Sequence, residues 1–191
     1  MKKYFTIFIL FSLFLSCFHK SVENDEADDI VKAIIYHGKD GAYLVTVESI
    51  FQASSKSSEN GISYTTGYTD LRITSYDMTT GKQSARVASG DQTEENNTML
   101  GWNEGNIWFY SMEDGLHSRD PKTLDIKITQ DKILGKNPML GKAMAECEWY
   151  KITQYFAFEY ATEKLIITDN QGFHYSLDPV SFNTEKLKND Y

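Results

Sequence analysis

The chain has little of what marks several common classes of protein. Among its 191 residues are only two cysteines, Cys17 and Cys147, and three prolines. Lysine and arginine together number 19, against 27 aspartates and glutamates, which leaves a formal net charge of −8 at pH 7. Binding to phosphates needs lysines and arginines gathered in patches. We therefore expect no nucleic-acid partner.

Motifs of familiar catalytic and metal sites are also missing. The serine-rich stretch 54–58 lacks the Gly-x-Ser-x-Gly elbow of a nucleophile. Lys82 has neither the upstream glycine nor the following helix of a phosphate-binding loop. His117 and His174 lack a third ligand at a recognisable spacing for zinc. We therefore predict no catalytic residue, no cofactor and no metal ligand.

The chain starts with a short apolar run. Lys2 and Lys3 precede the largely apolar residues 4–15. At about 1.5 Å per residue this run would span about 18 Å as a helix, less than a hydrocarbon core of about 30 Å. Such a run after two lysines is typical of the hydrophobic region of a secretory signal peptide. A short membrane anchor is the alternative.

The end of this run, Leu13-Phe14-Leu15-Ser16-Cys17, resembles the lipobox of bacterial lipoproteins. The resemblance implies that residues 1–17 are a lipoprotein signal peptide and that the thiol of Cys17 receives a diacylglycerol. Phe14 departs from the pattern, because a smaller aliphatic residue is usual there. Two or more acyl chains anchor a protein stably, since each buried CH₂ contributes about 0.8 kcal/mol. Ordinary signal cleavage beside Cys17 is the alternative.

An acidic segment, 18–29, follows the signal. It carries five acidic residues and few apolar ones, so burial cannot offset the entropy of ordering it. We predict a flexible tether that holds a domain over residues 30–191 away from the membrane. The protein would then be a lipoprotein of the bacterial cell envelope, at the outer membrane or cell surface rather than in the cytoplasm. Without lipidation of Cys17 it would be secreted or periplasmic.

The remainder repeats a pattern of strands and turns. The chain is rich in tyrosine and phenylalanine, a mixture that suits strands better than helices. Three strands each run into a turn at an aspartate, namely Asp77, Asp120 and Asp178, and a further strand follows each turn. The aspartate can accept backbone N–H bonds, and Gly81 can supply a positive φ near the end of the first turn. Each unit is interpreted as a four-stranded antiparallel meander of about 40–45 residues.

A four-stranded unit repeated at this period is typical of a β-propeller blade. The units resemble blades of quinoprotein-like propellers, in which a strand leads through Asp-x-x-Thr-Gly-Lys into the outer strand. Residues 77–82 keep that pattern, whereas Leu124 and Phe182 replace the glycine in the later copies. The order of elements over residues 40–190 is also similar to an uncharacterised family of exported bacterial propeller-like proteins. That resemblance implies no site residues.

We therefore predict an all-β domain of about three such meanders, propeller-like but partial or open, because closed propellers need at least four blades. Residues 51–61 are expected to form a polar hairpin loop. Asn137-Pro138 suits the start of a helix, and apolar residues at helical spacing predict one short helix near residues 138–147. This helix would bury Cys147, although a lone thiol in an exported protein could instead be reactive.

These features favour a non-catalytic, membrane-anchored envelope lipoprotein that acts as a binding or scaffold module. Its partners would be the membrane, through the lipid anchor, and an envelope protein or a second copy. One alternative is an enzyme or a cofactor-binding propeller that uses a quinone or a carbohydrate, with Trp102, Trp108 and Trp149 as an aromatic platform. Another is a truncated propeller relative without activity of its own, with open sheet edges that associate.

Overall fold

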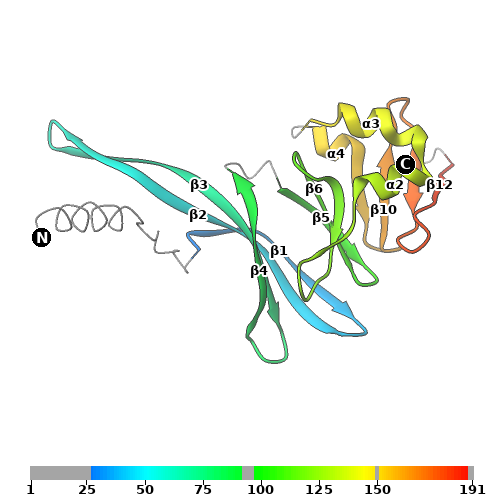
Figure 1. Cartoon of the computed structure of the whole chain (residues 1–191), viewed down its shortest axis with the longest axis horizontal. Helices are drawn as coiled ribbons and strands as arrows, with labels where there is room; N and C mark the ends of the chain where they lie inside the picture. Colours follow the sequence, from blue (N-terminus) through cyan, green and yellow to red (C-terminus); the bar gives the residue numbers. More distant parts are fainter. Residues whose placement is uncertain (1–26, 92–96, 149–150, 189–191) are drawn as a thin grey trace, which may run out of the picture.

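The computed structural model describes residues 27–91, 97–148 and 151–188, and these form three four-stranded antiparallel sheets (Figure 1). In each sheet the strands follow one another in sequence order, so each sheet is a meander. The predicted all-β class, with about three meanders in an open, propeller-like arrangement, is confirmed. The three sheets do not close into a barrel.

The elements run along the chain as follows. Sheet A contains β1 (Asp29–Gly38), β2 (Gly41–Glu59), β3 (Ile62–Asp77) and β4 (Gln83–Asp91). Sheet B contains β5 (Asn97–Asn103), β6 (Asn106–Ser111), β7 (Gly115–Arg119) and β8 (Ile126–Ile128). Short helices follow: α2 (Gln130–Lys136), η1 (Pro138–Leu140), α3 (Gly141–Glu146) and α4 (Ile152–Tyr155). Sheet C contains β9 (Phe156–Glu159), β10 (Lys164–Thr168), β11 (His174–Leu177) and β12 (Thr184–Lys186).

The three aspartate-led turns share one geometry. The Asp77 carboxylate accepts hydrogen bonds from the backbone N–H groups of Thr79 and Thr80, at 2.8 and 3.0 Å. Asp120 and Asp178 accept the equivalent pair of bonds in their own turns. Each aspartate also accepts, on its backbone carbonyl, the N–H of the residue four positions on. The repeat inferred from the sequence is therefore a repeat of structure.

Sheet B lies between the other two sheets. All six residues of β6 are buried, because its side chains alternate between two cores. Ile107 and Phe109 pack with residues of sheet A, whereas Trp108 and Tyr110 pack with sheet C and the helices. Strands β1 and β5 contact each other, as do β5 and β9, so the sheets meet along their first strands.

The helix predicted near residues 138–147 is confirmed as part of a longer helical segment that includes α2 and α4. Leu140 and Met144 pack in the core between sheets B and C, and Ala143 is also buried. Cys147 follows α3 and is 4 % exposed, as the prediction of a buried cysteine requires.

The prediction of a polar hairpin loop over residues 51–61 is wrong. The residues continue strand β2, which pairs with β3 as far as Glu59 and Ile62, and only Asn60-Gly61 turns. Both turn residues have positive φ, as a tight hairpin turn requires. Serine was interpreted as a loop former, but the facing strand supplies threonines and tyrosines that favour a ladder.

Candidate functional site

The predicted lipidation site, Cys17, lies outside the described residues. So do the signal peptide 1–17, tether residues 18–26 and Trp149. Across the described ranges, no helix combines the length and apolar character that crossing a bilayer requires.

The two histidines singled out in the sequence occupy different sheets. His117 on β7 is fully buried, stacks on Phe109 with centroids 5.8 Å apart, and pairs through Nδ1 with the carbonyl of Gly115. Burial lowers the pKa of His117, and its Nε2 has no hydrogen-bond partner among the described residues. His174 on β11 pairs with Thr168. The structure therefore does not bring the two imidazoles together.

Four aspartates that could serve as catalytic carboxylates by residue type, Asp114, Asp120, Asp169 and Asp178, are engaged in turns or in an ion pair. Besides Asp120 and Asp178, Asp169 accepts bonds from the N–H groups of Gln171 and Phe173, and Asp114 lies 3.7 Å from a guanidinium nitrogen of Arg119. Backbone N–H groups, led by that of Ser181, lower the pKa of Asp178. These contacts account for Asp120, Asp169 and Asp178 as turn formers and for Asp114 as an ion-pair partner of Arg119.

Cys147 is a packed side chain rather than a reactive one. Its burial raises the pKa of the thiol, which keeps it protonated at neutral pH. The hydroxyl of Tyr110 donates to the Cys147 carbonyl at 2.9 Å, so this position joins sheet B to the helical segment.

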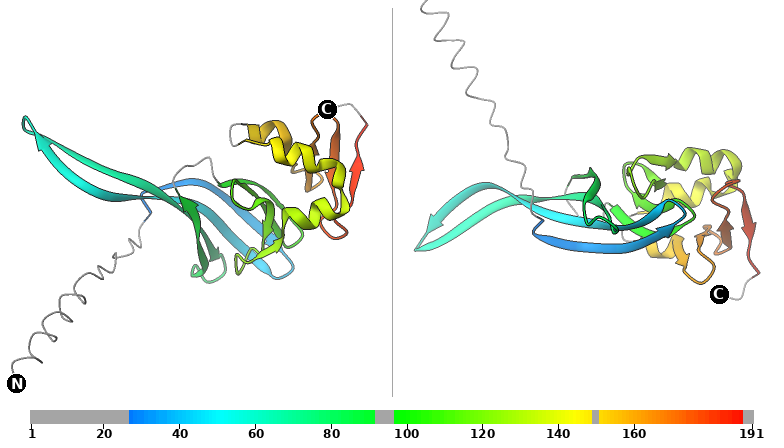
Figure 2. Two further views of the ribbon diagram at one scale, coloured as in Figure 1. Left: turned by 45° about the horizontal axis from the view of Figure 1, so that its top comes forward. Right: turned by 90° about the horizontal axis from the view of Figure 1, so that it is seen from below.

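A long hairpin extends from sheet A and is the most exposed part of the described chain. We define the arm as residues 51–68, the distal parts of β2 and β3. It projects away from the three sheets in every view (Figures 1 and 2). The pairing of β1 with β2 ends at Ser49, and β4 pairs with β3 no farther than Asp70. Both edges of the arm therefore lack a neighbouring strand in the described structure.

One face of the arm carries large exposed side chains. Ile62, Tyr64 and Tyr68 are 56 %, 49 % and 46 % exposed. Alternation along β3 puts these residues on the face opposite to the core residues Leu71 and Ile73. The predicted polar loop ended at residue 61 and did not include these side chains. The sequence analysis did not identify them as a surface, although the even-numbered spacing of Ile62, Tyr64 and Tyr68 was a signal for it.

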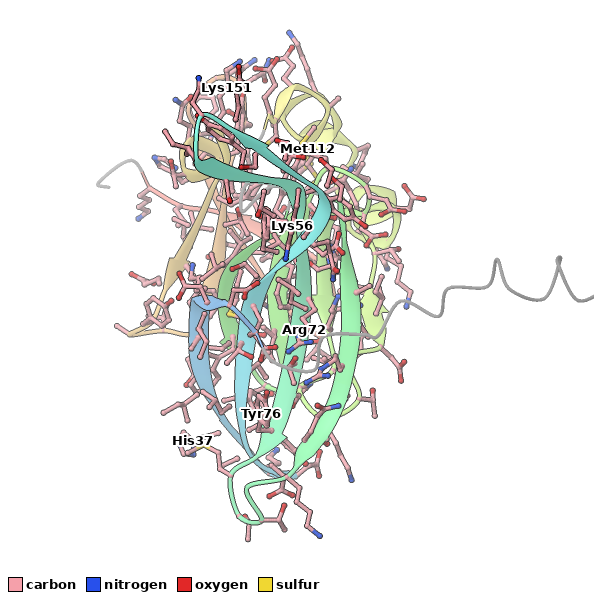
Figure 3. The ribbon with its side chains drawn as sticks, turned by 90° about the vertical axis from the view of Figure 1, so that its left-hand side faces the viewer. His37, Lys56, Arg72, Tyr76, Met112 and Lys151 are labelled. Carbon is pink, nitrogen blue, oxygen red and sulfur yellow. The ribbon has the colours of Figure 1, made fainter. Side chains whose placement is uncertain are left out.

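The same face continues onto sheet A as a buried ion-pair network (Figure 3). The Nε of Arg72 lies 2.6 Å from Glu48, whose carboxylate also accepts bonds from the hydroxyls of Thr46, Thr74 and Tyr76. Burial works against ionisation of Glu48, but these donors outweigh it and lower the pKa of the carboxyl. The network ties β2 to β3 at the base of the arm.

A pocket of about 500 Å³ opens at the other end of the sheets, where the β1–β2, β5–β6 and β9–β10 turns meet. Trp102 and Tyr36 line it, with ring centroids 5.5 Å apart and planes at 71°. Asp40, Glu104 and Glu163 also line it, one from each turn. The sequence analysis considered Trp102 but missed the acids, which share one signal: each lies between the first and second strands of its unit.

A second pocket, of about 440 Å³, adjoins the first and shares Glu104 and Glu163 with it. It adds Lys164, Asp178 and Glu185 among its lining residues. Of the three tryptophans weighed as a platform, Trp108 is fully buried in the core, where its indole N–H donates to Asn103. Only Trp102, of those the structure describes, lines either pocket.

Within the described ranges, no group of three or more histidine, cysteine, aspartate or glutamate side chains is placed to hold a metal ion. Comparisons of the chain with models of known protein families, with curated proteins and with solved structures found no match.

Proposed function

We propose that the protein is a non-catalytic lipoprotein of the bacterial cell envelope that holds a partner protein through the arm. The observation that carries this proposal is the arm itself: a two-stranded ribbon with exposed Ile62, Tyr64 and Tyr68 on one face. Exposed apolar side chains that cluster on a surface mark interaction sites in soluble domains. The lipid anchor at Cys17 and the tether belong to the same proposal.

The composition of the arm supports recognition of protein. Its tyrosines stand among serines and threonines along both strands. Tyrosine provides a large, rigid contact area at a low cost in conformational entropy, and small hydroxyl side chains adapt their hydrogen bonds to a partner. The Glu48–Arg72 network at the base holds the two strands together, so less conformational freedom is lost on binding.

Shortening the arm tests the proposal. Replacing residues 53–67 with Asn-Gly joins the cross-strand pair Gln52 and Tyr68 through a two-residue turn of the kind already present at Asn60-Gly61. Sheet A keeps all its pairings with β1 and β4, so the variant should fold. We expect it to lose a partner that the full-length protein retains in pulldowns from detergent-solubilised envelope.

A matched pair of cross-linking positions identifies the contact face. A photo-crosslinking residue at position 64 should capture the partner, whereas one at position 65, on the opposite face of the same strand, should not. Equal capture at both positions, or none at either in the native envelope, would contradict the proposal.

The anchor has its own test. The mass of the mature N-terminus should correspond to acylated Cys17, and Cys17→Ala should move the protein from the membrane fraction to the soluble fraction. A variant that stays in the membrane would show that something other than this thiol holds the protein there.

The alternative of a cofactor- or carbohydrate-binding propeller has one specific support, the pocket lined by Trp102 and three carboxylates. The alternative of a truncated relative predicts association through open sheet edges. Sedimentation of the arm-shortened protein over a range of concentrations distinguishes this alternative from the proposal. Under the alternative, the remaining sheet edges should still associate.

A further inference from the structure

We infer that the pocket lined by Trp102 binds a small organic ligand that carries a positively charged amino group. The pocket has a volume of about 500 Å³, within the range typical of small-molecule sites. It lies where β1 meets β2, β5 meets β6 and β9 meets β10. The arm lies at the far ends of β2 and β3, so this site is distinct from the proposed partner-binding surface.

Two aromatic side chains, Trp102 and Tyr36, line the pocket. Trp102 is partly buried, and Tyr36 meets it edge to face at 5.5 Å. The hydroxyl of Tyr36 accepts the backbone N–H of Gly105 at 2.9 Å, which fixes the tyrosine against the β5–β6 turn. Trp102 is among the residues that line the pocket, and an aromatic ring attracts a cation through its quadrupole, tryptophan most strongly.

Acidic residues outnumber lysines around the pocket. Three acidic residues, Asp40, Glu104 and Glu163, line the pocket together with one lysine, Lys39, and one histidine, His37. The adjoining pocket adds two further carboxylates, Asp178 and Glu185, against one more lysine. Carboxylates gathered at a hollow raise the local concentration of cations and oppose the entry of anions. The ligand should therefore be positively charged.

The acidic residues that line the pocket come from different parts of the chain. Asp40, Glu104 and Glu163 come from three separate turns, and no three acidic, cysteine or histidine side chains of the described chain are grouped closely enough to share a metal ion. An organic cation is larger than a metal ion and can reach a carboxylate at one end and the indole at the other. An ammonium group on a carbon framework suits both walls.

Glucosamine and cadaverine are suitable probes, with N-acetylglucosamine as the uncharged counterpart of the first. Titration of the full-length protein in detergent, followed by calorimetry, should show both amines binding at least about tenfold more tightly than N-acetylglucosamine. Raising the salt from about 50 mM to about 300 mM should weaken the binding, because exposed charges are screened.

Variants locate the site. Combining Glu104→Gln with Glu163→Gln should weaken binding of both amines about tenfold or more, and Trp102→Leu should weaken it as well. Glu113→Gln removes one carboxylate charge, against two in the double variant, from a turn at the opposite end of sheet B and should leave binding unchanged. The arm-shortened protein should bind the amines as the wild type does.

Three results would overturn the inference. The first is that neither amine binds at about 10 mM, where even a weak fragment site would be detected. The second is that N-acetylglucosamine binds as tightly as the amines. The third is that Glu113→Gln weakens binding as much as the double variant does. The second would indicate a neutral carbohydrate site and the third a general effect of surface charge. None of them bears on the partner proposed for the arm.

Discussion

At the scale of single residues, one backbone requirement is met by three different side chains. Gly81, Leu124 and Phe182 stand at the same position of the aspartate-led turns, with φ of 68°, 62° and 59°. A left-handed conformation costs a residue with a Cβ about 1–3 kcal/mol. Leu124 is fully buried between sheets A and B, and Phe182 packs against the core between sheets B and C. Burial of a large apolar side chain, worth about 1.5–3 kcal/mol, offsets the strain.

Substitutions at two of these turn positions should each lower stability, one by leaving a cavity and the other by straining the backbone. Leu124→Gly relaxes the backbone but leaves a cavity, and should lower the free energy of unfolding by about 1–4 kcal/mol. Gly81→Ala should lower it by about 1 kcal/mol through strain alone, because nothing lies within 4 Å of the added Cβ. Urea denaturation measures both. A more stable Leu124→Gly variant would show that strain outweighs packing at this turn.

At the scale of elements, Asn137 fastens the helical segment to sheet C. Its Nδ2 donates to the carbonyls of Ile133 and Phe182, at 2.8 and 2.6 Å. Its Oδ1 accepts from the backbone N–H and the hydroxyl of Thr184, at 3.1 and 2.7 Å. One buried amide therefore serves both the end of α2 and the turn between β11 and β12. The sequence analysis assigned Asn137 to a helix start and did not detect the second partner, which lies 45 residues away.

Removing this amide should loosen two elements together. Asn137→Ala leaves buried backbone groups without partners, each costing about 1–3 kcal/mol, so we expect a loss of about 2–4 kcal/mol. Hydrogen exchange should accelerate in α2 and β12 and much less in sheet A. Asn170→Ala, in an exposed turn of sheet C, is the matched control and should change little. Uniform acceleration across all three sheets would contradict a local role.

The arm shows where prediction of elements failed. The tight turn at Asn60-Gly61 and the strands on either side of the aspartate turns follow from local chemistry, and the sequence contains the necessary residues. Whether residues 51–59 form a strand depends on the residues they face across the hairpin. Thr65 faces Lys56 and Tyr64 faces Ser57, in a register that differs by one residue from that of the core pairs such as Val47 with Ile73, because the pairing shifts between Ala53 and Ser55.

At the scale of the whole molecule, the two end faces of the stack differ from the faces between sheets. The outer face of sheet A carries the Glu48 and Arg72 network. Sheet C has Thr168 and His174 at positions where sheet B has the buried Tyr110 and Leu116. Stacked repeats need more polar terminal faces to remain soluble. The polar groups on the outer faces of sheets A and C agree with this requirement.

Acid should lower the stability of the protein in two pH ranges, called here the first and second stages. Burial lowers the pKa of His117, so the unfolded chain binds a proton more readily, and stability should begin to fall below about pH 6.5. Hydrogen bonds lower the pKa values of Glu48, Asp169 and Asp178 despite the opposing effect of burial, so a further loss is expected below about pH 4. Thermal melts between pH 3 and pH 8 measure both stages.

The variant His117→Gln should abolish the first stage and retain the second. Gln has no group that titrates in this range, so its stability should be flat between about pH 5 and pH 7. A first stage that persists in this variant would assign it to another group.

The sequence by itself determined the repeated unit, the aspartate-led turns and the buried helix, because hydrogen bonds within a turn and alternation along a strand are local. Only the tertiary structure decided which faces are buried and what lies at the two ends of the stack. Asp40, Glu104 and Glu163 are about sixty residues apart in succession and meet at one pocket only because the first strands of the three sheets contact one another. Local patterns carry no record of that contact, since the stacking of whole sheets creates it.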